Sequence, residues 1–376
     1  MKRSNARPRV MLLFGGRSGE HSISCVTAGC ILRSIDRDRF EPVPVGVTRE
    51  GRWTLVDDAP DKLAIRDGRL PEVQVEGPEP VPPTSAGSKT WRLLDDDGRV
   101  RPLGPIDVVF PLFHGPFGED GTVQGLLELT DQRYVGSGVL ASAVAMDKGY
   151  TKVVLEAHGL QVAPYTVVTP AEWAAAPADA LARAAELGFP LFVKPCRAGS
   201  SLGITKVARL EDLADGIVHA AQTDPRVLVE KAVPGREIEC AVLGSPPPAA
   251  PRASLPSEIV VSADHDFYDF EAKYLDAGGA QLVCPADMPA EAEAALRSMA
   301  AAAFQAVGGE GLARVDFFYD PDAPPLAQLT VNEINTMPGF TPISQYPRMW
   351  QASGIDYTRL VSELIELALA RPVGPR

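Results

Sequence analysis

Apolar runs alternate with amphipathic segments along most of the chain, which is the pattern of an α/β protein. The run RVMLLF at residues 9–14 predicts a buried strand, and residues 22–35 carry apolar side chains at helical spacing. The same alternation continues toward the C-terminus. It predicts further strands at 106–113, 189–195, 226–231 and 236–244, and further helices at 121–131, 139–158, 170–187 and 356–371.

Two apolar segments near the C-terminus, residues 311–320 and 326–335, flank a proline-rich turn and predict a β-hairpin. Two other stretches, residues 75–89 and 245–256, are rich in proline and small residues. Such compositions favour turns, so we expect surface excursions without regular structure at both places.

Net charge limits the classes of partner that we expect, and cysteine content indicates the cellular compartment. The chain has 376 residues and a formal net charge of −13, which argues against nucleic acid or an anionic membrane as the main partner. No segment reaches the roughly 18 consecutive apolar residues of a membrane span. The five cysteines are dispersed without CxxC spacing, as is typical of the reducing cytoplasm. We therefore expect a cytoplasmic protein that binds neither nucleic acid nor membrane.

Three glycine-rich loops are candidates for ligand binding. Residues 12–22 join a predicted strand to a predicted helix and carry Glu20, whose carboxylate could bind an ammonium group; the alternative is an ordinary tight turn. Residues 136–141, GSGVLA, match a dinucleotide fingerprint, but the next predicted strand offers no acidic residue for the ribose. A nicotinamide-dependent oxidoreductase therefore remains an alternative.

The third loop, residues 194–207, places Lys194 at the end of a strand and follows it with glycine and serine. Backbone N–H groups and hydroxyls of such a loop can bind phosphate while the lysine supplies positive charge. We expect phosphate contact here, and an ordinary hairpin loop is the alternative.

The predicted hairpin carries charged residues in apolar strands. Side chains alternate along a strand, so Glu333 and Asn335 point the same way, as do Arg314 and Asp316 on the neighbouring strand. Two carboxylates and an amide, without His or Cys, favour Mg²⁺ or Mn²⁺ over zinc. We expect a metal–phosphate site, and an Asp–Arg salt bridge on a solvated face is the alternative.

Taken together, the motifs resemble the D-alanine–D-alanine ligases of the ATP-grasp superfamily, in family order and over nearly the whole chain. The resemblance implies an N-terminal D-alanine-binding α/β domain at 1–146 and two ATP-grasp subdomains at 147–235 and 236–376. The stretches that carry it are GGRSGEHSIS, FPLFHGPFGEDGTVQGLLEL, YVGSGVLASAVAMDK, VKPCRAGSSLGITKV, EKAVPGREIE, FYDFEAKY and RVDFFYD followed by VNEINTMPGFTPIS.

The resemblance also implies an activity. It is the ATP-dependent joining of two D-alanines to D-alanyl-D-alanine through a D-alanyl phosphate, with ADP and phosphate as co-products, for peptidoglycan precursor synthesis. The family implies ATP, two Mg²⁺ ions that Mn²⁺ can replace, and a homodimer. Alternatives are a ligase that uses D-lactate or D-serine as its second substrate, and a nucleotide-binding regulator without catalysis.

Residue roles follow from the resemblance, position by position. On the amino-acid side, Glu20 would bind the first D-alanine's ammonium group near His114, and Ser344 would bind the carboxylate of the second D-alanine. Arg314 and the Gly339 N–H would stabilise the oxyanion. The implied magnesium ligands are Asp316, Glu333 and Asn335, and the implied nucleotide contacts are Lys148, Lys194, Ser201, Glu230, Lys231, Val233, Glu237, Lys273 and Asn332.

A lid over the site is expected at residues 262–280, because an acyl phosphate must be kept from water. The resemblance pairs Ser200 with Tyr274 in closing a loop over the substrates, and Lys273 would reach the γ-phosphate. The sequence departs from the family at Cys196, where many relatives have serine, and at Ala232, beside the expected adenine.

Overall fold

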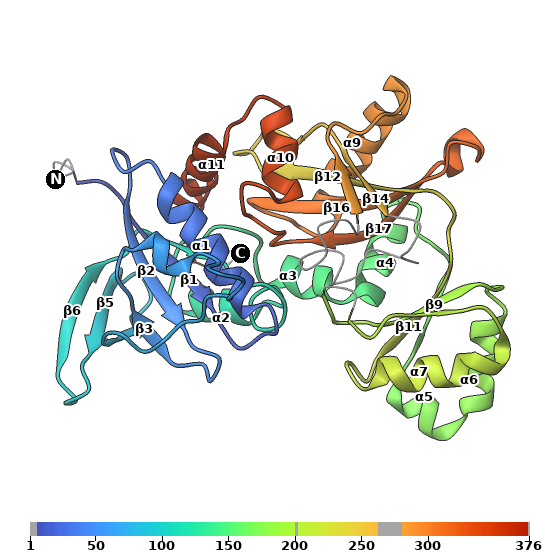
Figure 1. Cartoon of the computed structure of the whole chain (residues 1–376), viewed down its shortest axis with the longest axis horizontal. Helices are drawn as coiled ribbons and strands as arrows, with labels where there is room; N and C mark the ends of the chain where they lie inside the picture. The colour runs from blue at the N-terminus through green and yellow to red at the C-terminus, as the bar shows by residue number, and fades with distance from the viewer. Residues whose placement is uncertain (1–5, 200–201, 262–279, 375–376) are drawn as a thin grey trace.

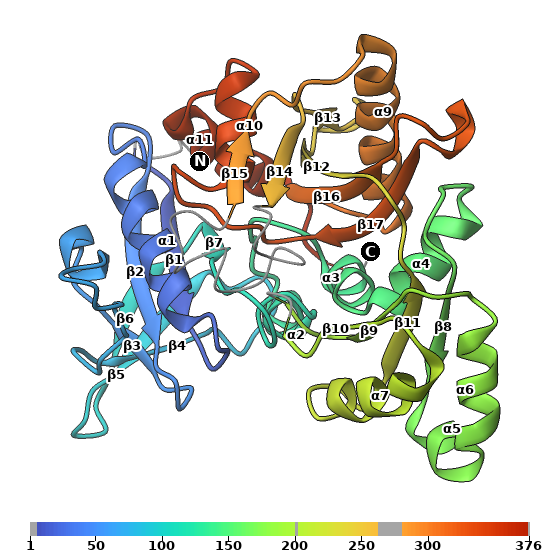
Figure 2. The same cartoon turned by 45° about the vertical axis from the view of Figure 1, so that its right-hand side comes forward.

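The computed structural model describes residues 6–199, 202–261 and 280–374. All but the last residue of the expected lid lies outside the described residues, as do Ser200, Ser201, Lys273 and Tyr274. We describe the chain in three parts, which we call the N-terminal part (residues up to 146), the central part (147–235) and the C-terminal part (from 236), and Figures 1 and 2 show the sheets of each. No helix in the described ranges is long and apolar enough to cross a bilayer.

The N-terminal part is built on a sheet of order β3-β2-β1-β7. The predicted first strand is confirmed as β1, which lies parallel to β2 and β7. Side chains of β1 alternate between two apolar clusters, one with α1 and one on the opposite face with Trp91, so both faces of the sheet are covered. The elements are β1 (Arg9–Gly15), α1 (His21–Ser34), β2 (Glu41–Val47), β3 (Trp53–Leu55), η1 (Pro60–Leu63) and β7 (Val108–Pro111).

The expectation of no regular structure at residues 75–89 is wrong in part. A strand, β4 (Glu79–Val81), forms there and pairs with β5 (Thr90–Leu94), which in turn pairs with β6 (Val100–Pro105). Because β4 is an edge strand, its proline removes no hydrogen bond that a second neighbour would need.

The predicted helix at 139–158 is wrong as a single element. It is divided into α3 (Val139–Met146) and α4 (Lys148–Ala157), with Asp147 as the N-cap of α4. Asp147 has an extended backbone, and its side chain accepts hydrogen bonds from the N–H groups of Gly149 and Tyr150. The predicted helix at 121–131 is confirmed as α2 (Thr122–Leu129).

The central part carries a four-stranded sheet of order β10-β9-β11-β8. The predicted helix at 170–187 is two helices, because Pro177 begins a new one after the non-helical Ala176. The elements are β8 (Tyr165–Val168), α5 (Pro170–Ala175), α6 (Pro177–Ala185), β9 (Leu191–Pro195), β10 (Thr205–Val207), η2 (Leu210–Asp212), α7 (Leu213–Ala221) and β11 (Val227–Lys231).

The C-terminal part contains the largest sheet, of order β15-β14-β12-β16-β17, with β13 paired to β12. The predicted hairpin is confirmed by the antiparallel pairing of β16 and β17. The expected loop at 245–256 contains the short strand β13, which corrects that expectation in part. The elements are β12 (Arg236–Leu243), β13 (Arg252–Ala253), β14 (Ser257–Val261), β15 (Ala280–Val283), α9 (Ala290–Ala306), β16 (Leu312–Tyr319), η3 (Pro325–Ala327), β17 (Leu329–Asn335), α10 (Gln345–Ala352) and α11 (Tyr357–Ala370).

One apolar cluster spans the N-terminal and C-terminal parts. Phe340, which is fully buried, lies 6.2 Å from the Phe110 ring of β7 and 5.5 Å from the Tyr357 ring of α11. Helix α11 packs against both α1 and β7, and Figure 1 shows it beside α1. The two parts therefore share a core, and the segment that follows β17 is anchored against the N-terminal sheet.

Arg371, just after α11, is a second link between these two parts. Its Nη1 donates to the Gly136 carbonyl at 2.8 Å, and its guanidinium lies 4.2 Å from the ring centroid of Tyr134. It also forms an ion pair with Glu310. Arg371 is 7% exposed, so its bonds are shielded from water.

We predict that Arg371→Ala lowers the free energy of unfolding by about 2–4 kcal/mol, because buried carbonyl acceptors lose their donor. Arg359→Ala on α11, where the arginine is exposed and pairs with Glu363, is the control and should cost at most about 1 kcal/mol. Chemical denaturation of both variants measures the difference, and equal losses would show that Arg371 is no such link.

Candidate functional site

Two cavities adjoin each other where the three parts meet. The first has a volume of about 550 Å³ and lies between the central and C-terminal sheets. It brings together seven of the predicted nucleotide-binding residues: Lys148, Lys194, Glu230, Lys231, Val233, Glu237 and Asn332. The other two, Ser201 and Lys273, lie outside the described residues.

The second cavity, of about 560 Å³, lies between the N-terminal and C-terminal parts and is lined by the predicted amino-acid-binding residues Glu20, His114, Gly339 and Ser344. The two cavities share part of their lining, so they meet rather than lie on separate faces. The shared residues are Lys148, Ala198, Gly199, Glu239, Arg314 and Glu333.

Strand alternation explains why charged residues face the cavities. On β16, Val315 and Phe317 pack into the cluster under α9, so Arg314 and Asp316 point to the opposite face. The register places Arg314 opposite Asn335 and Asp316 opposite Glu333, so the two faces predicted from the sequence meet. The four side chains thus belong to one patch of the sheet.

A register shift at Asp316/Phe317 adds Asn332 to the first cavity. Phe317 pairs with Val331 while Asp316 pairs with Glu333, which leaves Asn332 as the extra residue of a bulge in β17. Bulges redirect side chains. Asn332 and Glu333, adjacent in sequence, therefore both line the same cavity.

Arg314 is held by two carboxylates. Its Nε and Nη2 each donate to Asp316 at 2.7 Å, and its Nε lies 3.0 Å from Glu239 Oε1. Burial alone would lower the pKa of Arg314, but Asp316 and Glu239 raise it well above its ordinary value. The Asp–Arg pair weighed as an alternative does exist, but both side chains are only 14% exposed, so it is not on a solvated face.

Lys148 occupies the junction of the two cavities. Its ammonium donates to the Ala198 carbonyl at 2.7 Å and lies 3.6 Å from Glu333 Oε2. Lys148 is the first residue of α4, and Ala198 follows β9, so the ammonium connects the helix to the start of the glycine-rich loop. This position suits contact with an anionic group that reaches from one cavity to the other.

The Glu20 carboxylate lies between two glycines from different parts of the chain. A Cβ built on Gly115 would be 3.0 Å from Glu20 Oε2, and one built on Gly199 would be 3.4 Å from it. Gly115 also has a positive φ of +74°, which side chains rarely adopt. The loop at residues 12–22 thus turns a carboxylate toward the glycine-rich loop of the central part.

His114 is neutral and engaged with the protein. Its Nδ1 is 3.0 Å from the Met337 carbonyl and its Nε2 is 3.4 Å from Thr27 Oγ1. Burial lowers the pKa of His114, although the nearby Glu20 charge opposes that shift. A neutral imidazole that donates from Nδ1 therefore joins the N-terminal part to the segment after β17.

Gly339 and Ser344 lie together at the start of α10. A Cβ on Gly339 would be 3.2 Å from Ser344 Oγ, which also accepts a hydrogen bond from the Thr341 N–H at 3.1 Å. Ser344 is the N-cap of α10. The N-terminus of a helix favours anionic groups such as carboxylates.

Comparisons with known proteins agree with this arrangement. The family model for the D-ala D-ala ligase N-terminus matches residues 9–137, and the model for the D-ala D-ala ligase C-terminus matches residues 154–366. The chain belongs to the D-alanine–D-alanine ligase family.

Relatives match over nearly their full length. The chain is 53% identical to the D-alanine–D-alanine ligase of Arthrobacter sp., over 99% of this chain and 97% of the relative, and 50% identical to that of Streptomyces coelicolor, over 98% and 95%. The solved D-alanine–D-alanine ligase of Coxiella burnetii is 34% identical, with a TM-score of 0.79 and coverage of 96% and 94%. A D-alanine:D-serine ligase of Enterococcus faecalis is 31% identical, with a TM-score of 0.81 and coverage of 96% and 100%. The ATP-grasp fold predicted from the resemblance is thereby confirmed.

Three residues of this family member's site escaped the sequence interpretation. Glu239 pairs with Arg314, and strand alternation from Glu237 was the signal that could have found it. Lys152 is 1% exposed and lies 2.9 Å from Glu230 Oε2, while Lys194 pairs with the other oxygen. The two lysines lower the pKa of Glu230, although burial opposes them, so this carboxylate is ionised and fixes the position of Lys194.

Glu119 is the third missed residue. It lines the second cavity and accepts a hydrogen bond from the Gly115 N–H at 2.6 Å. Burial and the nearby Glu20 charge raise the pKa of Glu119 to about 8, against the partial opposition of that hydrogen bond. The ligase therefore carries a protonated carboxyl beside Glu20 at neutral pH.

We predict a pH-dependent stability that originates at Glu119. In the folded protein this carboxyl keeps its proton between its ordinary pKa of 4.5 and about 8, whereas the unfolded chain loses it, so folding is favoured less as pH rises through that window. Glu119→Gln cannot ionise, so its stability relative to the unsubstituted protein should increase with pH, by at most about 1.4 kcal/mol per pH unit.

Thermal or chemical unfolding at about pH 5.5 and about pH 8.5 measures this change. Glu186→Gln, at an exposed position, is the control. Stability differences that stay constant across the pH range for both variants would refute the assignment.

Proposed function

We propose that the protein uses ATP to join two molecules of D-alanine to D-alanyl-D-alanine. This dipeptide is a precursor for peptidoglycan synthesis. The supporting observation is that a nucleotide-sized cavity and an amino-acid cavity meet at Lys148, Arg314 and Glu333. The D-alanine–D-alanine ligases of Arthrobacter sp. and Streptomyces coelicolor are 53% and 50% identical to this chain over nearly its whole length.

The chemistry explains why the cavities must meet. A carboxylate does not condense with an amine in water, because its oxygen is a poor leaving group. Attack of a D-alanine carboxylate oxygen on the γ-phosphorus of ATP forms D-alanyl phosphate and releases ADP. The free amine of a second D-alanine then attacks the carbonyl carbon, the tetrahedral oxyanion collapses, phosphate leaves with the bond's electron pair, and the amine loses a proton.

Residues of the second cavity have roles that fit these reaction steps. Glu20 binds the ammonium group of the first D-alanine, and Ser344 at the start of α10 binds the carboxylate of the second. Arg314 and the Gly339 N–H stabilise the oxyanion. Asp316 and Glu239 hold the Arg314 guanidinium in a fixed orientation, which lowers the reorganisation needed when negative charge develops.

The nucleotide occupies the first cavity. Lys148 and Lys194 neutralise phosphate charge, and the ion pair with Glu230 holds Lys194 in place. Lys231, Val233 and Glu237 line this cavity. Lys231 and Val233 would contact the adenine, and Glu237 would accept a hydrogen bond from the ribose. Asn332 adds a polar contact from the β17 bulge.

The residues present fit magnesium by the chemistry of the donors. In the described ranges, no cluster of three or more His, Cys, Asp and Glu side chains could hold a metal ion. The proposed ligands are two carboxylates and an amide (Asp316, Glu333 and Asn335), the small oxygen set that Mg²⁺ uses when substrate phosphates complete its coordination. Two Mg²⁺ ions, or Mn²⁺ in their place, would supply charge neutralisation for the phosphoryl group.

The second substrate is proposed as D-alanine rather than D-serine or D-lactate. The D-alanine:D-serine ligase of Enterococcus faecalis shares the fold at 31% identity, whereas the 50–53% identical relatives are named for D-alanine alone. The domain boundaries 146/147 and 235/236, a homodimer and a cytoplasmic location belong to the same proposal.

Product analysis tests this function. We expect ADP release from ATP to depend on D-alanine, with D-alanyl-D-alanine as the main product by mass spectrometry when D-alanine, D-serine and D-lactate are supplied equally. L-alanine is the control and should yield no dipeptide. A main product that contains serine or lactate would overturn the choice of second substrate, and ATP binding without any ADP release would favour a regulator.

The magnesium ligands can be tested by a substitution that keeps side-chain volume. Glu333→Gln should lower kcat by about 100-fold or more, because it removes a negative charge from the proposed metal site. The unfolding midpoint should change little, since Glu333 is part-exposed in the cavity. Unchanged turnover at ordinary Mg²⁺ would exclude Glu333 as a ligand.

A further inference from the structure

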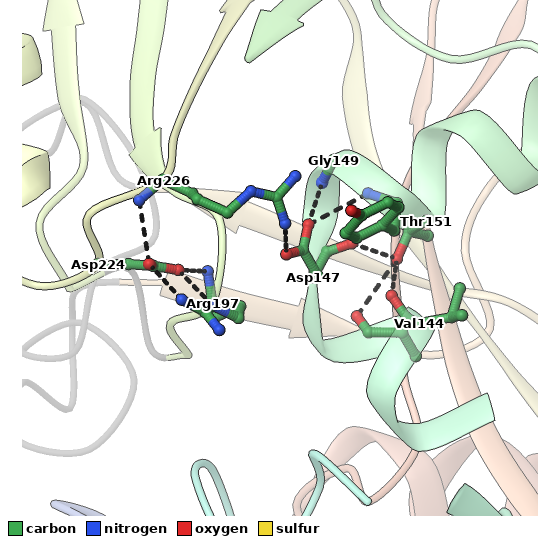
Figure 3. Close-up of polar contacts among 9 residues, drawn as sticks. Val144, Asp147, Gly149, Thr151, Arg197, Asp224 and Arg226 are labelled. Carbon is green, nitrogen blue, oxygen red and sulfur yellow. Dashed lines mark hydrogen bonds and ion pairs between the residues drawn. The ribbon is translucent and has the colours of Figure 1, made fainter. Parts of the chain in front are cut away.

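Four charged residues form a chain behind the junction of the two cavities: Asp147, Arg226, Asp224 and Arg197 (Figure 3). The described lining of both cavities includes none of them. They nevertheless lie next to two elements of the proposed phosphate site, namely the start of α4 with Lys148 and the stretch Cys196–Gly199 that follows β9.

The first half of the chain fixes the start of α4. Asp147 is 4% exposed, and its Oδ1 accepts from the N–H groups of Gly149 and Tyr150, both at 3.1 Å. Its Oδ2 forms an ion pair with Arg226, whose guanidinium lies 4.5 Å from the ring centroid of Tyr150. Figure 3 shows Arg226 reaching across to Asp147. Arg226 thus binds the helix end that carries Lys148.

The second half fixes the beginning of the glycine-rich loop. Asp224 is 3% exposed and accepts from the Arg197 N–H at 2.8 Å and from the Arg197 guanidinium at 2.9 and 2.8 Å. It also accepts from the Arg226 N–H at 3.1 Å. Burial alone would raise the pKa of Asp224, but Arg197 and these N–H groups lower it, so the carboxylate stays charged.

Backbone hydrogen bonds close the connection. The Arg226 carbonyl accepts from the Cys196 N–H, and the Cys196 carbonyl accepts from the Lys148 N–H, both at 3.0 Å. Arg226 therefore contacts the start of α4 through its side chain, and Cys196 and Asp224 through its backbone. A change in its side chain alters one of these links and leaves the backbone links in place.

We propose that Arg226 is a positioning residue for the phosphate end of the nucleotide cavity, because it ties the helix that carries Lys148 to the stretch Cys196–Gly199. This inference rests on the proposed ATP site. Without the Arg226–Asp147 pair, the first turn of α4 keeps only the hydrogen bonds of Lys148 to the Cys196 and Ala198 carbonyls, so it is held less firmly relative to this stretch. The Lys148 ammonium and the N–H groups of Ala198 and Gly199 then no longer present one fixed geometry to a phosphate.

The test must separate positioning from folding. Arg226→Gln alone leaves the buried Asp147 carboxylate without its partner charge, which destabilises the protein. The double variant Asp147→Asn with Arg226→Gln removes both charges, and asparagine remains a good helix N-cap. Arg226→Lys keeps the charge and serves as the conservative variant. Arg209→Gln, in an exposed pair with Asp212 in the same central part, is the matched control.

We expect the double variant to keep a near-normal unfolding midpoint and to raise the KM for ATP by about 10-fold, with the KM for D-alanine changed less than about twofold. Arg226→Lys, which keeps the positive charge, should raise the KM for ATP less than the double variant does. Arg209→Gln should have the same KM values as the unsubstituted protein. A double variant with an unchanged KM for ATP, or with the two KM values raised alike, would overturn the inference.

Failure of the proposed function remains distinguishable from failure of this inference. The unsubstituted protein must first show D-alanine-dependent ADP release, and its absence refutes the function. Calorimetric binding of ATP with Mg²⁺ to the unsubstituted and double-variant proteins is then measured without amino acid. Equal dissociation constants would refute the positioning role whichever amino acid the enzyme uses.

Discussion

The pairing register of β16 with its two neighbours determines the chemistry of the site. Strand β16 carries Arg314 and Asp316 on the face opposite α9, and its neighbours bring Glu239 from β12 and Glu333 from β17 to the same patch. A shift of one residue would turn these charges into the apolar cluster under α9, at a prohibitive cost in desolvation. The apolar residues of the other face therefore fix the positions of the charged ones.

The remaining structure brings other groups to this patch. The cluster around Phe340 anchors the segment after β17 to the N-terminal sheet, which places Gly339 within reach of Glu20 and His114 across the second cavity. On the other side, α4 and the stretch after β9 bring Lys148 to Glu333. The segment after β17, which lines the second cavity, is thus fixed by an apolar core shared between the N-terminal and C-terminal parts. The phosphate end of the first cavity depends instead on polar contacts between separate elements.

Sequence patterns predict the features that depend on the alternation of apolar and polar side chains within a single segment. The hairpin, its Arg314–Asp316 and Glu333–Asn335 faces, and the strand before the glycine-rich loop followed from local spacing. Contacts between distant segments did not: the burial of Lys152 against Glu230 and the proximity of Glu119 to Glu20 arise only when separate elements pack. The helix break at Asp147 was also missed, because an aspartate in an amphipathic run fits a polar helix face as well as an N-cap.

The GSGVLA motif shows why a glycine pattern alone does not determine function. Gly136 lies against Gly311 of the C-terminal part, where a Cβ built on Gly311 would be 2.8 Å from the Gly136 nitrogen. The Gly136 carbonyl accepts from Arg371 at 2.8 Å. Gly311 therefore has no room for a side chain, and Gly136 has a φ of +100°, which side chains rarely adopt, so the first glycine of the motif is explained by backbone conformation at a contact between parts of the protein, without a dinucleotide. The same residue type at Gly115 and Gly199 instead leaves room for the Glu20 carboxylate, so what each glycine does follows from what it faces.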